Sequence, residues 1–536
     1  MSFSKKKYSN SNYLLSFSFC FLSFFALLSQ PKKTNFASEE DAEFLFKYQN
    51  YKDAISIYHQ LLKKEPENYT YNYKIGFCYL NTYINKGEAL KYFKFCFNHP
   101  KSKGDNSLIY LIARSYHLNY VLDSAIVFYK KYADLNEKNN FEKSKAELGM
   151  MQIESAKELI KSPLKISFQN LGSDVNTEFP DYIPWVSTDE KKLFFTSRRK
   201  GIHSKEIETD GYYSSDIFFS EDINGKWEKV KNLPGPGINS SLDEELVGIR
   251  PDGDELIIYK DLIDQFGDLY YSVKLSTNYT RPEKYGQNVN GGLEFSGSIS
   301  SDDKYFFFVR KSEGKNGNQD IYVCKKLPNG GWGIPISAGE KINTKYDEDF
   351  PFLAANGKTL YFSSQGHNSM GGFDLFRSEW DETSNTFSEP VNLGYPLNTT
   401  DDEKNISLLP DERAGYISAC RKDGLGDLDI YRIKFEDHEG PYTFINLKIQ
   451  YSDSNVCSNY LTTVSLSKKG EKKLIGKYKT DQIKGNCILA LSSGVYNITV
   501  ESEGYEDLNE TIEISDIGAT QHEEKRKFTL QKIIER

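Results

Sequence analysis

The spacing of apolar residues changes along the chain and divides it into three regions. Between about Asp41 and Ser162, apolar and aromatic residues recur every three or four positions, which predicts amphipathic helices. From Leu164 to about Glu436, and again from Pro441 to residue 535, apolar and polar residues alternate in short runs, which predicts β-strands. We therefore expect a multidomain chain with one helical unit followed by two β units.

The helical region contains an internal repeat. Ala54, Ala89 and Ala125 recur at intervals of 35 and 36 residues, and Pro66 and Pro100 lie 34 residues apart. A small residue lets two helices approach closely, and proline ends a helix because it lacks an amide donor. The pattern resembles about three tetratricopeptide repeats, a helical solenoid, with residues 141–160 as a capping helix. The resemblance implies a groove that binds a peptide or a protein. The alternative is that the tyrosines of this region serve mainly as core and rim packing: Tyr71, Tyr73, Tyr79, Tyr116 and Tyr129.

A longer repeat runs through residues 164–436. An Asp followed by an apolar and an aromatic residue occurs five times at spacings of 52, 52, 54 and 55 residues: Asp216, Asp268, Asp320, Asp374 and Asp429. A period of this length with several short strands is typical of propeller blades, each built from four antiparallel strands. We expect five blades, because a sixth would need a degenerate repeat for which the sequence has no room.

Further positions repeat in phase with this signature. Each unit begins with an asparagine: Asn176, Asn239, Asn290, Asn343 and Asn398. The first strand, at KISFQNLGSDVN, has the pattern of a final blade strand, so we predict that it pairs with the last blade and closes the ring. The repeats resemble WD-like, TolB-type propellers.

A carboxylate also repeats near the start of each unit. Its positions are Asp181, Glu244, Glu294, Glu348 and Glu403. In propellers the first strand of each blade lines the central channel, so these acids are candidates for a negative ring that holds a cation or a basic side chain of a partner. The alternative, which we favour, is that each acid binds turn amides within its own blade, because residues that occur only once mark sites better than repeated ones.

Signatures of catalysis and of metal binding are missing from the sequence. None of the seven histidines has a ligand spacing such as HExxH, and no GxSxG elbow occurs. The signature aspartates are expected to be buried acceptors that fix the adjacent hairpin. We expect no enzyme activity, no catalytic or metal-binding residue and no cofactor.

The last region, residues 441–535, contains Tyr496 within GVYNI and Tyr505 after Glu503-Gly504. This pattern resembles carboxypeptidase-regulatory-like β-sandwiches, in which loops bind sugars or proteins. Both tyrosines are expected to be core residues. Cys457 and Cys487 fall in this unit and are the one pair for which we consider a disulfide.

The first 37 residues have the form of a secretory signal. Three lysines, Lys5 to Lys7, precede an apolar run from Leu14 to Leu28, and Ala37 offers a small-residue cleavage point. An uncleaved membrane anchor is the alternative, although the run is shorter than the ~20 residues that a spanning helix needs. The net charge of −9 is spread along the chain, so no nucleic-acid partner is expected.

This order of regions resembles envelope proteins of Bacteroidota related to the type IX secretion component PorE. The resemblance implies a non-enzymatic periplasmic scaffold that binds envelope proteins and associates with the outer membrane. Members commonly continue into an OmpA-like domain that binds peptidoglycan; the sequence runs to Arg536 without that pattern, so peptidoglycan anchoring is not carried over. The alternative function is a carbohydrate-binding or sensing module.

Overall fold

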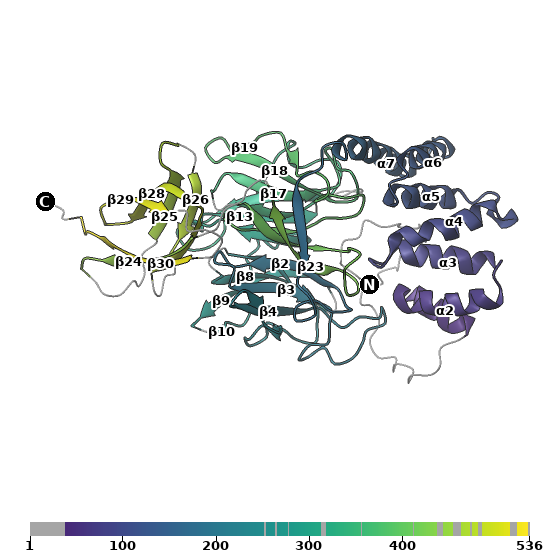
Figure 1. The fold of residues 1–536 in the computed structure, drawn as a ribbon, viewed down its shortest axis with the longest axis horizontal. Helices are drawn as coiled ribbons and strands as arrows, with labels where there is room; N and C mark the ends of the chain where they lie inside the picture. Colours follow the sequence, from purple (N-terminus) through teal and green to yellow (C-terminus); the bar gives the residue numbers. More distant parts are fainter. Residues whose placement is uncertain are drawn as a thin grey trace, which may run out of the picture.

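The computed structural model describes residues 38–250, 253–262, 265–276, 278–311, 318–354, 356–410, 412–436, 443–453, 462–471, 474–480, 485–514 and 522–533. Helices, a central group of sheets and a smaller pair of sheets follow one another along the longest axis of the molecule (Figure 1). The order in space is therefore the order in the sequence.

The helical part begins at residue 39. Its helices are α1 (Glu39–Lys47), α2 (Tyr51–Lys64), α3 (Tyr69–Leu80), α4 (Ala89–Asn98), α5 (Asn106–Leu118), α6 (Leu122–Leu135) and α7 (Asn140–Leu159), with 3₁₀ turns at η1 (Lys86–Glu88) and η2 (Pro100–Ser102). Polar residues fix several starts: the side chains of Asn50, Asn68, Asp105 and Asn139 each accept a hydrogen bond from an amide in the first turn. The repeated Ala54, Ala89 and Ala125 are fully buried where neighbouring helices pack.

The predicted fold class is wrong in its first element, because the described residues do not show a tetratricopeptide solenoid. Seven α-helices are confined to residues 39–159, and the remainder of the described chain is mostly β-sheet. The helical hairpins pack on the propeller instead of standing as a separate array: His117 of α5 and Gln152 of α7 contact propeller carbonyls. Helical periodicity reports which face of a helix is buried, but it does not report whether a helix or a sheet covers that face.

Five sheets follow the helices. Their strands, in spatial order, are: β2 (Asp181–Val186), β3 (Lys192–Ser197), β4 (Asp216–Ile223) and β5 (Lys226–Trp227), with β6 (Lys231–Asn232); β7 (Glu244–Ile249), β8 (Glu255–Leu262), β9 (Gln265–Leu275) and β10 (Asn278–Tyr279), with β11 (Glu283–Lys284); β12 (Glu294–Ile299), β13 (Tyr305–Lys311), β14 (Gln319–Lys325) and β15 (Ile336–Ser337); β16 (Glu348–Leu353), β17 (Thr359–Ser364), β18 (Asp374–Asp381) and β19 (Thr386–Phe387), with β20 (Val391–Asn392); and β21 (Ile406–Leu408), β22 (Ala414–Ala419), β23 (Asp429–Phe435) and β1 (Ile166–Asn170). The sheets are antiparallel meanders, as in propeller blades.

The ring closes as the sequence predicts. Strand β1 pairs antiparallel with β23, from Ile166 opposite Phe435 to Asn170 opposite Tyr431. The last blade thus takes its outer strand from the beginning of the propeller. This exchange covers the edges of the first and last strands and ties the two ends of the ring together.

The C-terminal part is a sandwich of two sheets. One sheet has the order β27 (Asn486–Leu491), β24 (Thr443–Tyr451) and β30 (His522–Leu530); the other has β26 (Leu474–Lys479), β25 (Thr462–Lys468), β28 (Gly494–Ser502) and β29 (Leu508–Ile514). Tyr496 and Tyr505 are buried, and their hydroxyls donate to Ser492 O and Asp453 Oδ1, at 2.9 and 2.8 Å. Both are core residues, as expected.

Two sequence predictions lie outside the described residues. The secretory signal and its cleavage point fall in residues 1–37, and the suspected disulfide needs Cys457, whereas Cys487 is buried in the sandwich. Within the described part of the chain, no helix has the length and apolar character needed to cross a membrane. The predicted limits of the units stay predictions.

Candidate functional site

The repeated asparagines join each blade to the next. In each case the side-chain oxygen accepts from a backbone amide, and the side-chain nitrogen donates to the carbonyl of that same residue; the five partners are Ile430, Ile217, Leu269, Ile321 and Leu375. Each partner directly follows a signature aspartate of the preceding unit. The side-chain amide of each asparagine thus makes the pair of hydrogen bonds that a residue of a neighbouring strand would make. This role explains why asparagine repeats in phase with the signature.

The five predicted acids lie at equivalent places but are engaged within their own blades. Asp181, Glu244, Glu348 and Glu403 each accept from the backbone amide of the residue four positions earlier, at 2.6 to 2.9 Å. Glu294 accepts from the amides of Gly291 and Gly292. These contacts are those of the alternative that we favoured, in which each acid stabilises its own turn.

Basic side chains and burial reduce the charge of this ring further. Asp181, Glu244 and Glu294 are paired with Arg199, Lys260 and Arg310. Burial raises the pKa of Glu348 to about 8, and burial together with Asp374 raises the pKa of Glu403 above its usual range. The five acids therefore do not form an open negative ring.

The residue that follows each of these acids faces the centre of the propeller instead. These five residues are Tyr182, Glu245, Phe295, Asp349 and Lys404, and all of them line one cavity of about 70 Å³. Successive side chains of an extended chain point to opposite sides. When the side chain of an acid faces its own blade, the side chain of the next residue therefore faces the channel. Unlike the acids, these five residues differ from blade to blade.

Irregular backbone helps to place these side chains. Strands β2 and β16 are bulged directly after Tyr182 and Asp349. Within these bulges Ile183 and Phe350 have φ values of 52° and 46°, in the left-handed region that costs a side-chain-bearing residue roughly 1–3 kcal/mol. Both residues line the cavity, and such bulges re-aim side chains.

The pKa values of the three carboxyl groups in the cavity are shifted in different directions. Glu245 accepts from the Tyr182 hydroxyl at 2.8 Å, and burial raises its pKa to about 7. Asp349 accepts from the Ser296 hydroxyl at 2.6 Å, and burial raises its pKa as well. Burial also opposes ionisation of Asp402, but Lys86, Lys404 and Arg114 outweigh it and lower the pKa of this carboxyl.

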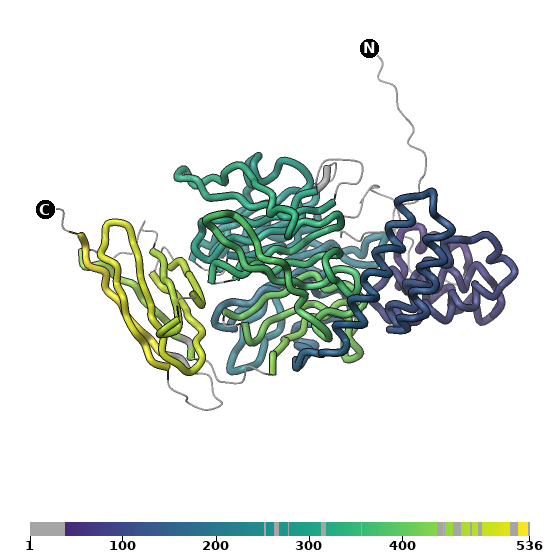
Figure 2. The backbone as a smooth tube through the Cα atoms, turned by 90° about the horizontal axis from the view of Figure 1, so that it is seen from above, coloured from purple at the N-terminus to yellow at the C-terminus, as the bar shows by residue number. Residues whose placement is uncertain are grey.

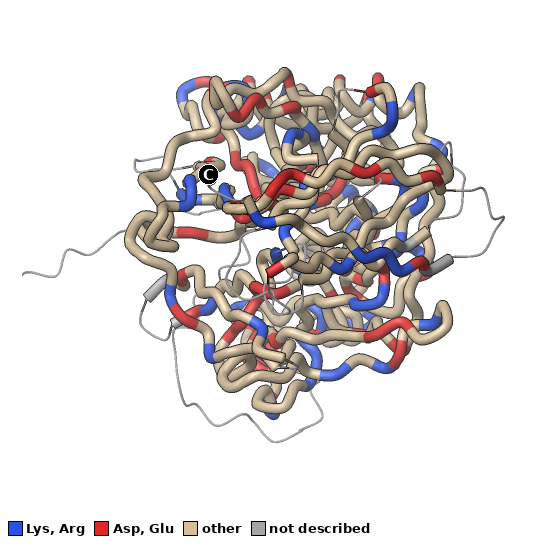
Figure 3. Tube along the Cα trace, turned by 90° about the vertical axis from the view of Figure 1, so that its left-hand side faces the viewer, with Lys and Arg blue, Asp and Glu red and all other residues tan. Residues whose placement is uncertain are grey.

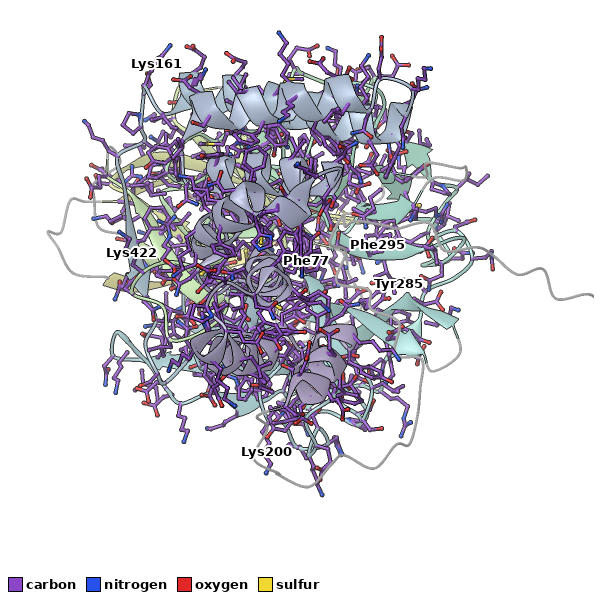
Figure 4. The ribbon with its side chains drawn as sticks, turned by 90° about the vertical axis from the view of Figure 1, so that its right-hand side faces the viewer. Phe77, Lys161, Lys200, Tyr285, Phe295 and Lys422 are labelled. Carbon is purple, nitrogen blue, oxygen red and sulfur yellow. The ribbon has the colours of Figure 1, made fainter. Side chains whose placement is uncertain are left out.

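The helical part covers this end of the channel. Tyr83, between α3 and η1, lines the cavity, and its carbonyl accepts from the Cys420 thiol. Lys86 pairs with Asp401 at 2.5 Å, and His117 Nε2 donates to Met370 O at 3.0 Å. Figure 4 views the molecule from this side, with the helices in front of the propeller strands and of Phe295, and Figure 2 shows α7 running against the propeller.

The sandwich covers the opposite end. A second cavity of about 50 Å³ is lined by propeller residues such as Trp185, Ile249 and Phe352 and by Tyr478 of β26. Beside it, Lys479 of the sandwich pairs with Asp303 of the propeller at 2.5 Å, and both side chains are almost fully buried. In the view from the sandwich side, acidic and basic residues alternate along the tube without separating by sign (Figure 3).

The signature aspartates are buried or partly buried, as predicted, but they are not identical. Asn232, Asn392 and Asn170 donate to Asp216, Asp374 and Asp429 from the neighbouring outer strand, whereas Asp268 pairs with Lys284. Burial raises the pKa of Asp216 to about 7 and of Asp374 to about 8. Among the described residues, no group of three His, Cys, Asp or Glu side chains is arranged to hold a metal ion.

The five acids that the sequence singled out do not line the cavity, whereas the residues that follow them do. The missed residues are Tyr182, Glu245, Phe295, Asp349 and Lys404. Their signal was present: they are the non-repeating position beside a repeated one in five aligned units. Tyr83 gave no such signal, because only the folded chain brings α3 to the channel.

No family model and no curated protein sequence matches this chain. Among solved structures, TolB from Acinetobacter baumannii is similar over 54% of this chain and 69% of that chain, with 15% identity and a TM-score of 0.31. A glycosyl hydrolase from Bacteroides ovatus is similar over 48% of this chain and 84% of that chain, with 8% identity and a TM-score of 0.30.

A third match, 3-chlorocatechol 1,2-dioxygenase from Rhodococcus opacus 1CP, involves 18% of this chain and 62% of that chain, with 16% identity and a TM-score of 0.15. This chain thus spans less than two thirds of that enzyme. At such identities and TM-scores, none of these likenesses supports a conclusion about function.

Proposed function

We propose that this protein is a non-enzymatic scaffold of the cell envelope. It acts in the periplasm, where it holds envelope proteins together in a process linked to type IX secretion or outer-membrane assembly. The observation that carries the proposal is the engagement of both ends of the propeller by flanking parts of the same chain. The propeller then acts as a spacer that fixes two outward-facing surfaces at opposite ends of an elongated body (Figure 1).

The covered channel supports a binding role more than a catalytic one. Tyr83 at one end and Tyr478 at the other belong to the parts that cap the two cavities. A polymeric substrate needs an open cleft to reach carboxylates in the channel. Hydrolysis of a polysaccharide by the purified chain, lost on Glu245→Gln, would contradict this part of the proposal.

The helical part has exposed apolar side chains that suit protein contacts. Val127 on α6 is 64% exposed, Leu135 at the end of α6 is 49% exposed, and Phe141 on α7 is 51% exposed. Exposed apolar groups rimmed by polar residues mark interaction surfaces. We expect an envelope protein to contact these side chains.

The experiment is crosslinking in cells of the tagged full chain and of the variant Val127→Asp/Phe141→Asp, followed by identification of the crosslinked proteins. We expect specific outer-membrane or periplasmic proteins with the parent chain and about a tenfold loss with the variant, since two apolar contacts of a binding surface are lost. Ile334→Asp is the matched control, because Ile334 is 80% exposed but belongs to the propeller. Equal recovery from all three chains, or recovery of glycans alone, would overturn the proposal.

A further inference from the structure

The cavity at the helical end of the channel has features that the scaffold role does not use. It is lined by one non-repeating residue from each of the five blades, together with Tyr83 from the helical part. Two of its wall residues, Ile183 and Phe350, have left-handed backbone. Apolar side chains on regular strands would be enough to fill the channel if it had only a structural role. Strained backbone, in contrast, is typical of binding sites.

A buried polar group in its wall lacks a partner. Asn405 lines the cavity, is 4% exposed, and its Oδ1 has no hydrogen-bond partner among the described residues. Nearly all buried side-chain oxygens in proteins accept at least one hydrogen bond. A hydrogen-bond acceptor without a partner in the wall of a cavity indicates that a ligand in the cavity donates a hydrogen bond to it.

The charges of the wall favour a cation. Three carboxyl groups line the cavity, those of Glu245, Asp349 and Asp402, against the single ammonium of Lys404 among its lining residues. Lys404 Nζ lies 4.5 Å from the ring centroid of Phe373, and its positive charge acts on all three carboxyl groups. Lys86, Lys404 and Arg114 already offset the charge of Asp402. Glu245 and Asp349 are therefore the carboxyl groups with which a bound cation would pair.

The remaining walls favour an organic cation over a metal ion. Tyr83, Tyr259, Phe295 and Phe350 contribute aromatic side chains to the lining. Aromatic faces attract ammonium groups, most strongly where water is excluded. The described residues contain no cluster arranged as metal ligands.

We propose that this cavity binds a small organic ammonium ion, held by the carboxylates of Glu245 and Asp349, by the aromatic walls and by a hydrogen bond to Asn405 Oδ1. At about 70 Å³ the cavity has room for roughly five water-sized groups. This size fits a free ammonium compound such as n-butylammonium, or the end of a lysine side chain supplied by a bound protein. The site lies inside the propeller, so the proposal does not depend on the scaffold function.

The test is isothermal titration calorimetry of the purified full chain at neutral pH. Choline and n-butylammonium are the free ammonium compounds, N-acetyl-lysine amide represents a lysine side chain, and 3,3-dimethyl-1-butanol is the neutral counterpart of choline. We expect a dissociation constant of about 1 mM or below for at least one ammonium compound and none measurable for the alcohol. Tighter binding of N-acetyl-lysine amide than of the free ammonium compounds would identify the lysine side chain of a bound protein as the source of the ammonium group.

Isosteric variants locate the site. Glu245→Gln and Asp349→Asn each remove one carboxylate and should each weaken binding about tenfold, while Asp320→Asn, a carboxylate of the same propeller that does not line the cavity, should not. Circular dichroism and thermal unfolding check that each variant folds. If Asp349→Asn does not fold, Glu245→Gln, whose side chain is only partly buried, decides the question.

Three results would overturn the proposal. The first is no binding of any ammonium compound up to about 10 mM. The second is equal binding of the neutral alcohol or of glucose, which would make the cavity an apolar or a sugar site. The third is equal weakening by Asp320→Asn, which would place the ammonium elsewhere.

Discussion

The two ends of the propeller are joined to their neighbours by different chemistry. On the sandwich side, Lys479 and Asp303 are 2% and 3% exposed and form an ion pair that Lys326 extends at 2.7 Å. On the helical side, the buried contacts include neutral hydrogen bonds from His117 to Met370 O and from Gln152 to Gln365 O, and the ion pair of Lys86 with Asp401 is more exposed. A buried charge network holds one geometry, because any displacement leaves charge unpaired, whereas neutral contacts tolerate adjustment.

The contacts at the two ends of the propeller should also differ in the pH at which they weaken. Burial opposes ionisation of Asp303, but Lys479 and Lys326 outweigh it and lower its pKa, so its contribution is lost only at acid pH below its usual value. Burial lowers the pKa of His117 to about 4. The helical end is therefore expected to weaken at a higher pH than the sandwich end.

The largest effect is expected from Asp303→Asn. The variant leaves the ammonium groups of Lys479 and Lys326 without their carboxylate, and removal of one member of a buried pair costs about 3–5 kcal/mol. Hydrogen exchange of the β26 amides should accelerate as the sandwich separates from the propeller. Lys477→Met is the control, since Lys477 is more exposed and lies 3.6 Å from Asp302; equal acceleration in both variants would show that the buried pair is not the main contact.

A smaller effect is expected when the pH is lowered for the parent chain. His117 takes up a proton near pH 6.5 in the unfolded chain but only near pH 4 in the folded chain, so the folded form binds fewer protons between these values. Its stabilising contribution is complete above pH 6.5 and should fall by about 2 kcal/mol between pH 7 and pH 5. Hydrogen exchange of the α5 amides measures this loss.

The variant His117→Phe provides the comparison for that experiment. It has no titrating ring, so the opening free energy of α5, obtained after correction for the intrinsic exchange rate at each pH, should change less between pH 7 and pH 5. An unchanged pH dependence would assign it to other groups at this end, such as Asp401 and Asp402.

The smallest effect is expected from Lys86→Met. The side chains of Lys86 and Asp401 are 12% and 29% exposed, and partly exposed ion pairs contribute at most about 1 kcal/mol. Urea unfolding should show a change within that limit, and the change should shrink at high salt. A loss as large as that of Asp303→Asn would mean that the two ends are equally dependent on charge.

Repetition explains how much of this molecule could be predicted. The blades, the pairing of β1 with β23 and the buried signature aspartates follow from a pattern repeated five times, because chance rarely keeps five copies in phase. The helical part offered fewer copies, and its periodicity left open what covers each helix. The tetratricopeptide solenoid was therefore the part of the fold prediction that was wrong.

For the site, the sequence by itself determined which strands line the channel and that a polar position recurs there. It could not decide that the repeated acids bind their own turns, which depends on backbone amides four residues earlier. The tertiary structure alone brought Tyr83, Asp349 and Asn405 to one cavity, since they lie more than 50 residues apart and meet only when the ring closes and the helices dock. Local periodicity encodes the faces of strands and helices, whereas a cavity is formed by the distances between them.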